Sequence, residues 1–264
     1  MNHPAAPSLV LCELADPGLP GLLSYSPFCL KVHHALRYAG LSYTRRHGRT
    51  PGDFKAHNPR GQVPVLLVDG RPIADSTPIL RFIEEETGAL ERGLDARSRA
   101  ESWLWEDHAD TALNGYVVAA RWADERNWPK VLDAYFGAAP WPVRGLVIPR
   151  VRARVIGGLH ARDVWRAGPE ACWARFERTL DLLEARAPAQ GFWVSAAPSA
   201  ADFAIFGQLH SLRTALTAYQ AEALGKRASL SAYLDRVGAV APVERAAGPV
   251  SRPRAAAQGS IALS

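Results

Sequence analysis

The sequence predicts two domains in chain order, an α/β domain over residues 8–88 and an all-α domain over residues 95–240. Strand and helix patterns alternate over the first 90 residues in the order β-α-β-α-β-β-α, whereas only helical spacing of apolar residues follows Leu90. The 264 residues are 48% hydrophobic and 22% charged, which is typical of a globular chain large enough for two domains. Residues 241–264, rich in Ala, Pro, Gly, Ser and Arg, predict a disordered tail.

The first elements of the α/β domain are predicted from short local patterns. Residues 9–14 are an apolar run that ends at a Gly/Pro loop, which indicates a strand. Residues 28–39 repeat apolar side chains at helical spacing, and Gly40 is placed to stop that helix. Residues 41–44 then predict a brief second strand, and residues 52–57 a short helix of poor propensity.

A hairpin and a helix complete this domain. Residues 65–68 and 72–73 are β runs separated by Asp69-Gly70, which is among the strongest short hairpin signals. Ser76 is expected to cap the helix that follows, because Ser is a preferred N-cap residue.

The second domain is predicted from helical spacing alone. Its aromatic residues at that spacing either belong to the core or line the pocket of a second substrate: Trp103, Trp105, Tyr116 and Trp122. Residues 127–168 are punctuated by Pro and Gly, and we predict no shape for this insert. Ser199 and Asp202 form a capping box, for which we expect a role in folding and none in catalysis.

Charge and composition exclude several functional classes. The net charge is +5 and the pI is about 9.3, which would suit nucleic acid or an anionic membrane, but the basic residues are scattered among acidic ones. We therefore predict no nucleic-acid partner. The chain starts without a basic and apolar leader and has no 20-residue apolar span, so we expect a cytoplasmic protein with no integral membrane segment. The three cysteines predict no disulfides, and the histidines lack the spacing of metal ligands.

The chemistry of the chain centres on the start of the first helix. Pro27 suits the first helical position, which makes Ser26 the N-cap and places Cys29 one turn further in. Unpaired N–H groups and the positive end of the helix dipole stabilise a thiolate at this point, and a Ser hydroxyl can donate a hydrogen bond to it. Without the neighbouring motifs, a simple helix cap would be the better interpretation.

Two further motifs suit the recognition of an extended peptide. Val63-Pro64 precedes a strand and suggests a cis-proline turn that leaves the backbone of Val63 free to pair with a ligand. Asp75-Ser76 opens a helix. Ser76 and the N–H groups of the helix start can donate hydrogen bonds to a ligand carboxylate, and the Asp75 carboxylate can bind a ligand ammonium. A ligand that carries both groups at one end therefore fits.

Together these motifs, over roughly residues 9–86, resemble the thioredoxin-like glutathione-binding domain of glutathione transferases. The resemblance implies that Ser26 is the catalytic residue and that Val63-Pro64 pairs with the cysteinyl backbone. It also implies that Asp75 and Ser76 hold the γ-glutamyl end, and that Gln62 contacts the glycyl end. Glu is more usual than Asp at position 75. The implied co-substrate is glutathione, the implied partner a small electrophile, and the implied assembly a homodimer.

A long loop before Ser26, the sequence Ser-Pro-Phe-Cys-Leu-Lys-Val and the Trp141-Pro142 region resemble the failed-axon-connections and metaxin-like branch of this superfamily. Some members of that branch have roles other than conjugation, so three functions stay open. The leading hypothesis is a glutathione transferase, active in detoxification, that ionises glutathione beside Ser26. The second is a glutathione-fold binding or scaffold protein without turnover. The third is glutathione-dependent thiol or peroxide chemistry through Cys29, which is weakened because Ser26 replaces the first Cys of a redox pair.

Overall fold

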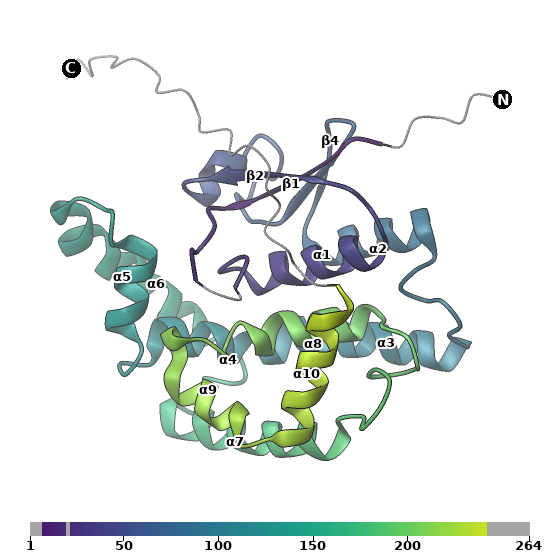
Figure 1. Cartoon of the computed structure of the whole chain (residues 1–264). Coiled ribbons are helices and arrows are strands. Elements are labelled where there is room, and N and C mark those ends of the chain that lie inside the picture. The colour runs from purple at the N-terminus through teal and green to yellow at the C-terminus, as the bar shows by residue number, and fades with distance from the viewer. Residues whose placement is uncertain (1–6, 20–21, 242–264) are drawn as a thin grey trace.

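A computed structural model describes residues 7–19 and 22–241 and confirms the predicted fold class. A four-stranded mixed sheet with helices is followed by an all-helical domain (Figure 1). The tail predicted over residues 241–264 lies outside the described residues except for Ala241.

The sheet has the strand order β2-β1-β3-β4. Strand β1 pairs in parallel with β2 and antiparallel with β3, and β3 and β4 form the predicted hairpin. Asp69 and Gly70 both have positive φ angles, 49° and 81°, as a tight hairpin turn requires. The bounds of the strands are β1 Leu9–Leu14, β2 Thr44–Gly48, β3 Val65–Val68 and β4 Arg71–Ala74.

Two predicted boundaries in this domain are wrong. The second strand was expected over residues 41–44 but covers Thr44–Gly48, because Leu41 belongs to the helix stop: its N–H donates to the C=O of Leu36 beside Gly40, whose φ is 71°. The strand is polar because it lies at the edge of the sheet. The short helix expected over residues 52–57 is a 3₁₀ turn over Pro51–Phe54.

Helices α1 (Pro27–Tyr38) and α2 (Ser76–Thr87) lie between the sheet and the helical domain (Figure 1). Their buried side chains join those of the sheet and of the helical domain in one hydrophobic core. A smaller cluster around Phe54 covers the opposite face of the sheet. The two domains therefore share a continuous apolar interior.

The helical domain begins with one long, nearly continuous helix. It consists of α3 (Ala96–His108) and α4 (Asn114–Val118), and a π-helical turn follows each of them, over Ala109–Leu113 and Ala119–Ala123. The insert, for which the sequence predicted no shape, forms two helices that project from the body (Figure 1). The remaining helices are α5 Trp128–Phe136, α6 Ile148–Leu159, α7 Pro169–Arg186, α8 Ala200–His210, α9 Ala218–Gly225 and α10 Ala228–Val240.

The predicted capping box starts α8 in the interior of this domain. The carboxylate of Asp202 is fully buried and accepts hydrogen bonds from the N–H of Ser199 at 2.8 Å, the Ser199 hydroxyl at 2.9 Å, the N–H of Trp193 at 2.7 Å and the Tyr233 hydroxyl at 2.7 Å. One carboxylate thus joins the start of α8, the loop before it and α10.

We predict that Asp202→Ala lowers the free energy of unfolding by about 3 kcal/mol, because it leaves buried donors without an acceptor. Urea denaturation measures the change. Asp181→Ala is the matched control, since Asp181 is an exposed helical residue of the same domain. A loss no larger than that of the control would contradict the structural role.

Candidate functional site

The strand pairing brings the three predicted ligand-binding segments to one edge of the sheet. Cys12, near the end of β1, lies opposite Val65, the first residue of β3, and Val65 lies opposite Ala74, the last residue of β4. The loop after β1, the turn before β3 and the residue after β4 therefore meet at this edge. Because β1-α1-β2 is a parallel crossover, α1 also begins there.

Ser26 is the N-cap of α1, as predicted. Its Oγ accepts a hydrogen bond from the N–H of Cys29 at 3.3 Å, and its own N–H donates to the Oγ of the buried Ser24 at 3.3 Å. The Ser26 side chain is partly exposed. Since its oxygen serves as an acceptor, its hydroxyl proton can be donated to an anion at the positive end of the helix.

Cys29 lies beneath this site as a fully buried, free thiol. Burial raises its pKa far above the ordinary value, and hydrogen bonds from the hydroxyls of Ser26 and Ser24 act in the opposite direction without reversing the shift. A protonated thiol without solvent access is a poor nucleophile. The environment of Cys29 favours the packing interpretation. Burial also raises the pKa of Cys12, and that of Cys172 to about 12.

The peptide bond between Val63 and Pro64 is cis, as the sequence suggested. The C=O of Pro64 accepts a hydrogen bond from the N–H of Asp75 at 3.1 Å, which joins two of the predicted binding segments directly. Within the described part of the chain, the N–H and C=O of Val63 have no hydrogen-bond partner. The side chain of Gln62 is exposed next to them, and the backbone C=O of Gln62 accepts a hydrogen bond from the side-chain amide of Asn58 at 3.0 Å.

Asp75 has φ 80° and ψ 150°, a backbone conformation that residues with a side chain rarely adopt. The sequence placed the cap of α2 at Ser76, but the N-cap is Asp75, whose Oδ1 accepts the N–H of Ser76 at 2.6 Å. The Asp75 side chain is exposed at the sheet edge, whereas Ser76 is fully buried with its hydroxyl 3.5 Å from the same oxygen. The exposed group of this pair is therefore the Asp75 carboxylate.

Two arginines hold the loop that leads to Ser26. Arg45 donates from Nη2 to the C=O of Leu23 at 2.9 Å and from Nε to the buried carboxylate of Glu13 at 2.5 Å. Burial alone would raise the pKa of Glu13, but His33, His47 and Arg45 outweigh it and hold that pKa well below its usual range. Glu13 thus remains an ionised anchor for Arg45.

The second arginine comes from the helical domain. Arg121 is 4% exposed and donates to the C=O of Tyr25 through Nη1 and to the C=O of Ser211 through Nη2 at 2.8 Å. It lies in the second π-helical turn, a local irregularity that is frequent at functional sites. Sequence reasoning missed Arg121. The available signal was a cation among apolar helical residues, where burial demands a partner.

Aromatic side chains line the loop on the side of the insert. The ring centroid of Tyr25 lies 4.6 Å from that of Tyr135 on α5, and Trp122 lies 6.0 Å from Tyr135 and 5.8 Å from Trp128. Of the four aromatic residues for which the sequence left two roles open, Trp122 thus belongs to the aromatic cluster that contacts Tyr25 through Tyr135. The other three pack elsewhere: Trp103 lies under the guanidinium of Arg81, Trp105 contacts Trp193, and Tyr116 contacts Phe176.

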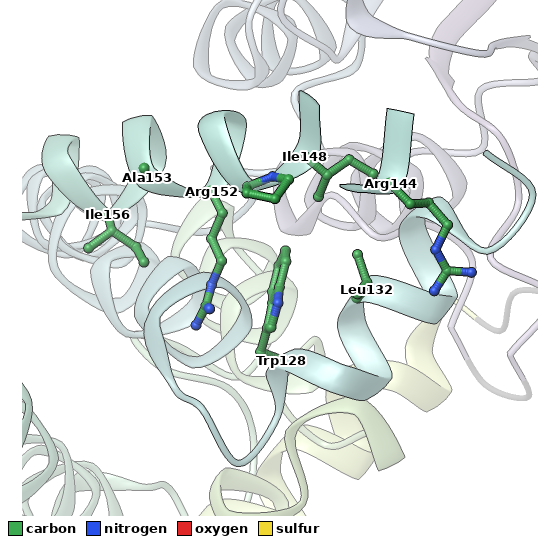
Figure 2. Close-up of a pocket in the computed structure, with 8 residues that line it drawn as sticks. Trp128, Leu132, Arg144, Ile148, Arg152, Ala153 and Ile156 are labelled. Atoms are coloured by element: carbon green, nitrogen blue, oxygen red, sulfur yellow. The ribbon is translucent and has the colours of Figure 1, made fainter. Parts of the chain in front are cut away.

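An apolar groove of about 320 Å³ lies between α5 and α6 (Figure 2). Apolar side chains such as Trp128, Leu132 and Ile148 line it, and Arg144 and Arg152 flank it. None of the predicted site residues lines this groove. Among the residues that the structure describes, no group of three or more His, Cys, Asp or Glu side chains could hold a metal ion.

Two sequence families match the chain: the N-terminal domain of glutathione S-transferases over residues 25–86, and the C-terminal domain of glutathione S-transferases over residues 149–236. The Drosophila melanogaster protein Failed axon connections is 26% identical over 214 residues, which cover 73% of this chain and 48% of that protein. Protein LigF of Sphingobium is 38% identical over 108 residues, 39% of this chain and 42% of that protein. The chain spans about half the length of these curated relatives.

Solved structures share the fold at low sequence identity. The crystal structure of the β-etherase LigF from Sphingobium has a TM-score of 0.56 and 22% identity, and the match covers 88% of this chain and 95% of that one. A glutathione transferase family member from Pseudomonas fluorescens, solved with two glutathione molecules bound, has a TM-score of 0.54 and 15% identity, with 88% of each chain covered.

We predict a pH dependence of stability that originates in His34 of α1. Burial and, to a smaller extent, the charges of His210, His33 and Arg37 together lower the pKa of His34 from 6.5 to about 3. The His34 ring packs 4.4 Å from that of Phe206 on α8. The unfolded chain therefore binds a proton that the folded chain excludes. Stability from this source is complete above pH 6.5 and is lost as the pH falls toward 3.

Urea denaturation across this pH range should show a steeper loss for the natural protein than for His34→Gln, by up to about 1.4 kcal/mol per pH unit. His160→Gln, at an exposed position, is the control. Parallel slopes for the natural protein and His34→Gln would refute the assignment.

Proposed function

Because the chain belongs to the glutathione S-transferase superfamily, we propose that it is a glutathione transferase that ionises the thiol of glutathione beside Ser26 for attack on a small electrophile. The observation that carries this proposal is the meeting of three segments at one sheet edge. The hydrogen bond from the N–H of Asp75 to the C=O of Pro64 joins two of them, and the start of α1 supplies the third.

The thiol chemistry rests on the environment of Ser26. Its hydroxyl would donate to the glutathione sulfur, and the positive end of α1 would favour the thiolate over the thiol. An ordinary thiol with a pKa near ~8.5 is only a few per cent ionised at pH 7, so a pKa about two units lower makes the thiolate the main form. Ser26 acts as a hydrogen-bond donor and forms no covalent bond.

The remaining segments suit the tripeptide itself. The N–H and C=O of Val63 would pair with the cysteinyl backbone in the manner of an added strand. The exposed Asp75 carboxylate would bind the γ-glutamyl ammonium, and the start of α2 would receive the neighbouring carboxylate. Gln62 is exposed beside Val63 and would contact the glycyl end.

The electrophile would bind on the aromatic side of the loop. Tyr25, the residue before Ser26, packs against Tyr135, which in turn contacts Trp122, and this aromatic cluster favours a flat, apolar or aromatic compound. By resemblance, we also propose that the protein is a homodimer and that it is located in the cytoplasm. Analytical ultracentrifugation measures the oligomeric state, and cell fractionation measures the location. No helix among the described residues is long and apolar enough to cross a membrane.

A glutathione-binding protein without turnover is the second candidate. The match to Failed axon connections extends over 73% of this chain, compared with 39% for protein LigF. Calorimetry and activity separate the two candidates: binding of glutathione with no turnover of any electrophile in a panel supports the second. The third hypothesis, chemistry at Cys29, finds no support in a thiol that is buried and held protonated.

We predict that Ser26→Ala returns the pKa of bound glutathione toward that of a free thiol. Ultraviolet absorbance of the thiolate, titrated in the complex, measures this pKa. At pH 7 the rate with a reactive aryl halide should fall roughly 25-fold, the ratio of the two ionised fractions. Ser98→Ala, which removes a hydroxyl from the first turn of α3, is the control. An unshifted thiol pKa in the natural complex, or full activity of Ser26→Ala, would contradict the mechanism.

We predict that Asp75→Asn weakens glutathione binding roughly fivefold by removing one partly exposed charge. Asn can still accept the N–H of Ser76 and tolerates a positive φ angle, so the start of α2 is preserved. Calorimetry with cysteinylglycine, which lacks the γ-glutamyl ammonium, is the matched control and should show no difference between the two proteins. Equal losses for both ligands would mean that the substitution disturbs the fold of the site.

A further inference from the structure

Exposed apolar side chains concentrate on the insert. The described residues include seven large apolar side chains that are exposed, and five of them fall between positions 141 and 151. Trp141 is 80% exposed and Leu146 57%. The others in this segment are Val143, Val147 and Val151. Such a concentration in one short segment marks an interaction surface.

The same insert carries the net charge of the chain. Residues 134–162 are an exception to the scattered charge pattern of the sequence, because they contain five arginines and no Asp or Glu, and the net charge of the whole chain is +5. The remainder of the sequence is therefore neutral by formal count. Two of these arginines form ion pairs, Arg144 with Asp133 and Arg152 with Glu125. Arg150 and Arg154 are exposed and form no ion pair among the described residues.

The exposed apolar and basic residues lie on the same outward face of the helix, because they follow helical spacing. Val143, Val147 and Val151 recur every four residues along η4 (the π turn Val143–Val147) and α6, and so do Leu146, Arg150 and Arg154. The inward side of α6 is set by the buried Ile148 and Leu159. The α5–α6 pair projects from the body (Figure 1), and the side chains on the other side of α6 are exposed. We call these six side chains (Val143, Leu146, Val147, Arg150, Val151 and Arg154), together with the exposed Trp141 just before η4, the basic apolar face.

We propose that the basic apolar face lies on the surface of an anionic lipid membrane, in the headgroup region, without crossing it. Apolar side chains and arginines on one helix face, with an exposed Trp just before the helix, are the composition of interfacial helices. The guanidinium groups of Arg150 and Arg154 can reach lipid phosphates while their stems lie along the apolar layer. This site is separate from the sheet edge and does not rest on the transferase proposal.

Charge and composition argue against other partners for this face. A second copy would bring two clusters of arginines together without acidic residues between them, which is unfavourable at close range. A nucleic acid would pair with the arginines but would leave the Trp and Val side chains without an apolar partner. An anionic membrane satisfies both kinds of side chain.

Sedimentation of the full chain with vesicles tests the proposal. We expect binding to vesicles of phosphatidylcholine and phosphatidylserine, at least roughly tenfold weaker binding to phosphatidylcholine alone, and loss of binding at high salt. The double variant Arg150→Gln and Arg154→Gln should bind the anionic vesicles roughly 30-fold more weakly, and Trp141→Ala should also weaken binding. The matched controls are Arg92→Gln with Arg97→Gln, exposed arginines outside the insert, and Leu182→Ala, a 72% exposed leucine on α7.

Three outcomes would overturn the proposal. One is equal sedimentation with neutral and anionic vesicles, or with neither. Another is unchanged binding in the arginine double variant. The last is a change from dimer to monomer in Trp141→Ala by analytical ultracentrifugation, which would assign the face to a second copy. All substituted side chains are exposed, so unchanged urea midpoints confirm that the variants fold.

Discussion

The position of the candidate site depends on one buried cation between the domains. Lys31 of α1 is fully buried, and its Nζ lies 2.7 Å from Oε1 of Glu106 and 2.5 Å from Oδ2 of Asp110, both in the helical domain. A buried ammonium is tolerated only with such partners, so α1 can dock in one register alone. Thr77 of α2 donates to the same Glu106 oxygen at 2.6 Å. The helix that starts at Ser26 is thus fixed against the second domain.

From this cation a series of polar contacts extends through the helical domain. Gln208 donates to Asp110 at 3.3 Å, Asn114 to Gln208 at 3.2 Å, and Arg162, at the end of the insert, to Asn114 at 2.8 Å. Asp110 lies in one π-helical turn and Arg121 in the other. Both irregular turns of the long helix therefore supply a charged group that contacts the sheet domain. A satisfied buried network such as that from Lys31 to Arg162 defines a single arrangement.

Features with local causes could be predicted from the sequence. The strand Leu9–Leu14, the Asp69-Gly70 hairpin, the cap at Ser26 and the capping box at Asp202 each follow from short-range chemistry, and the fold class follows from their order. The partners of long-range contacts could not be predicted from local patterns. The edge strand β2 lacks an apolar pattern, and the partners of Lys31 and Arg121 lie far away in the sequence. The ligand-binding residues could be named because their motif is local, whereas the groups that hold them in place could not.

Where α1 crosses α8, the two helices approach so closely that position 207 has room for a hydrogen atom only. A Cβ on Gly207 would lie 2.5 Å from the carbonyl oxygen of Pro27 and 3.2 Å from the N of Lys31. Any larger residue would push away the first turn of α1. The sheet domain of this chain therefore requires a helical domain with a matching residue at this crossing. A chimaera that joins this sheet domain to another helical domain can reproduce the crossing only if the new domain offers a glycine there.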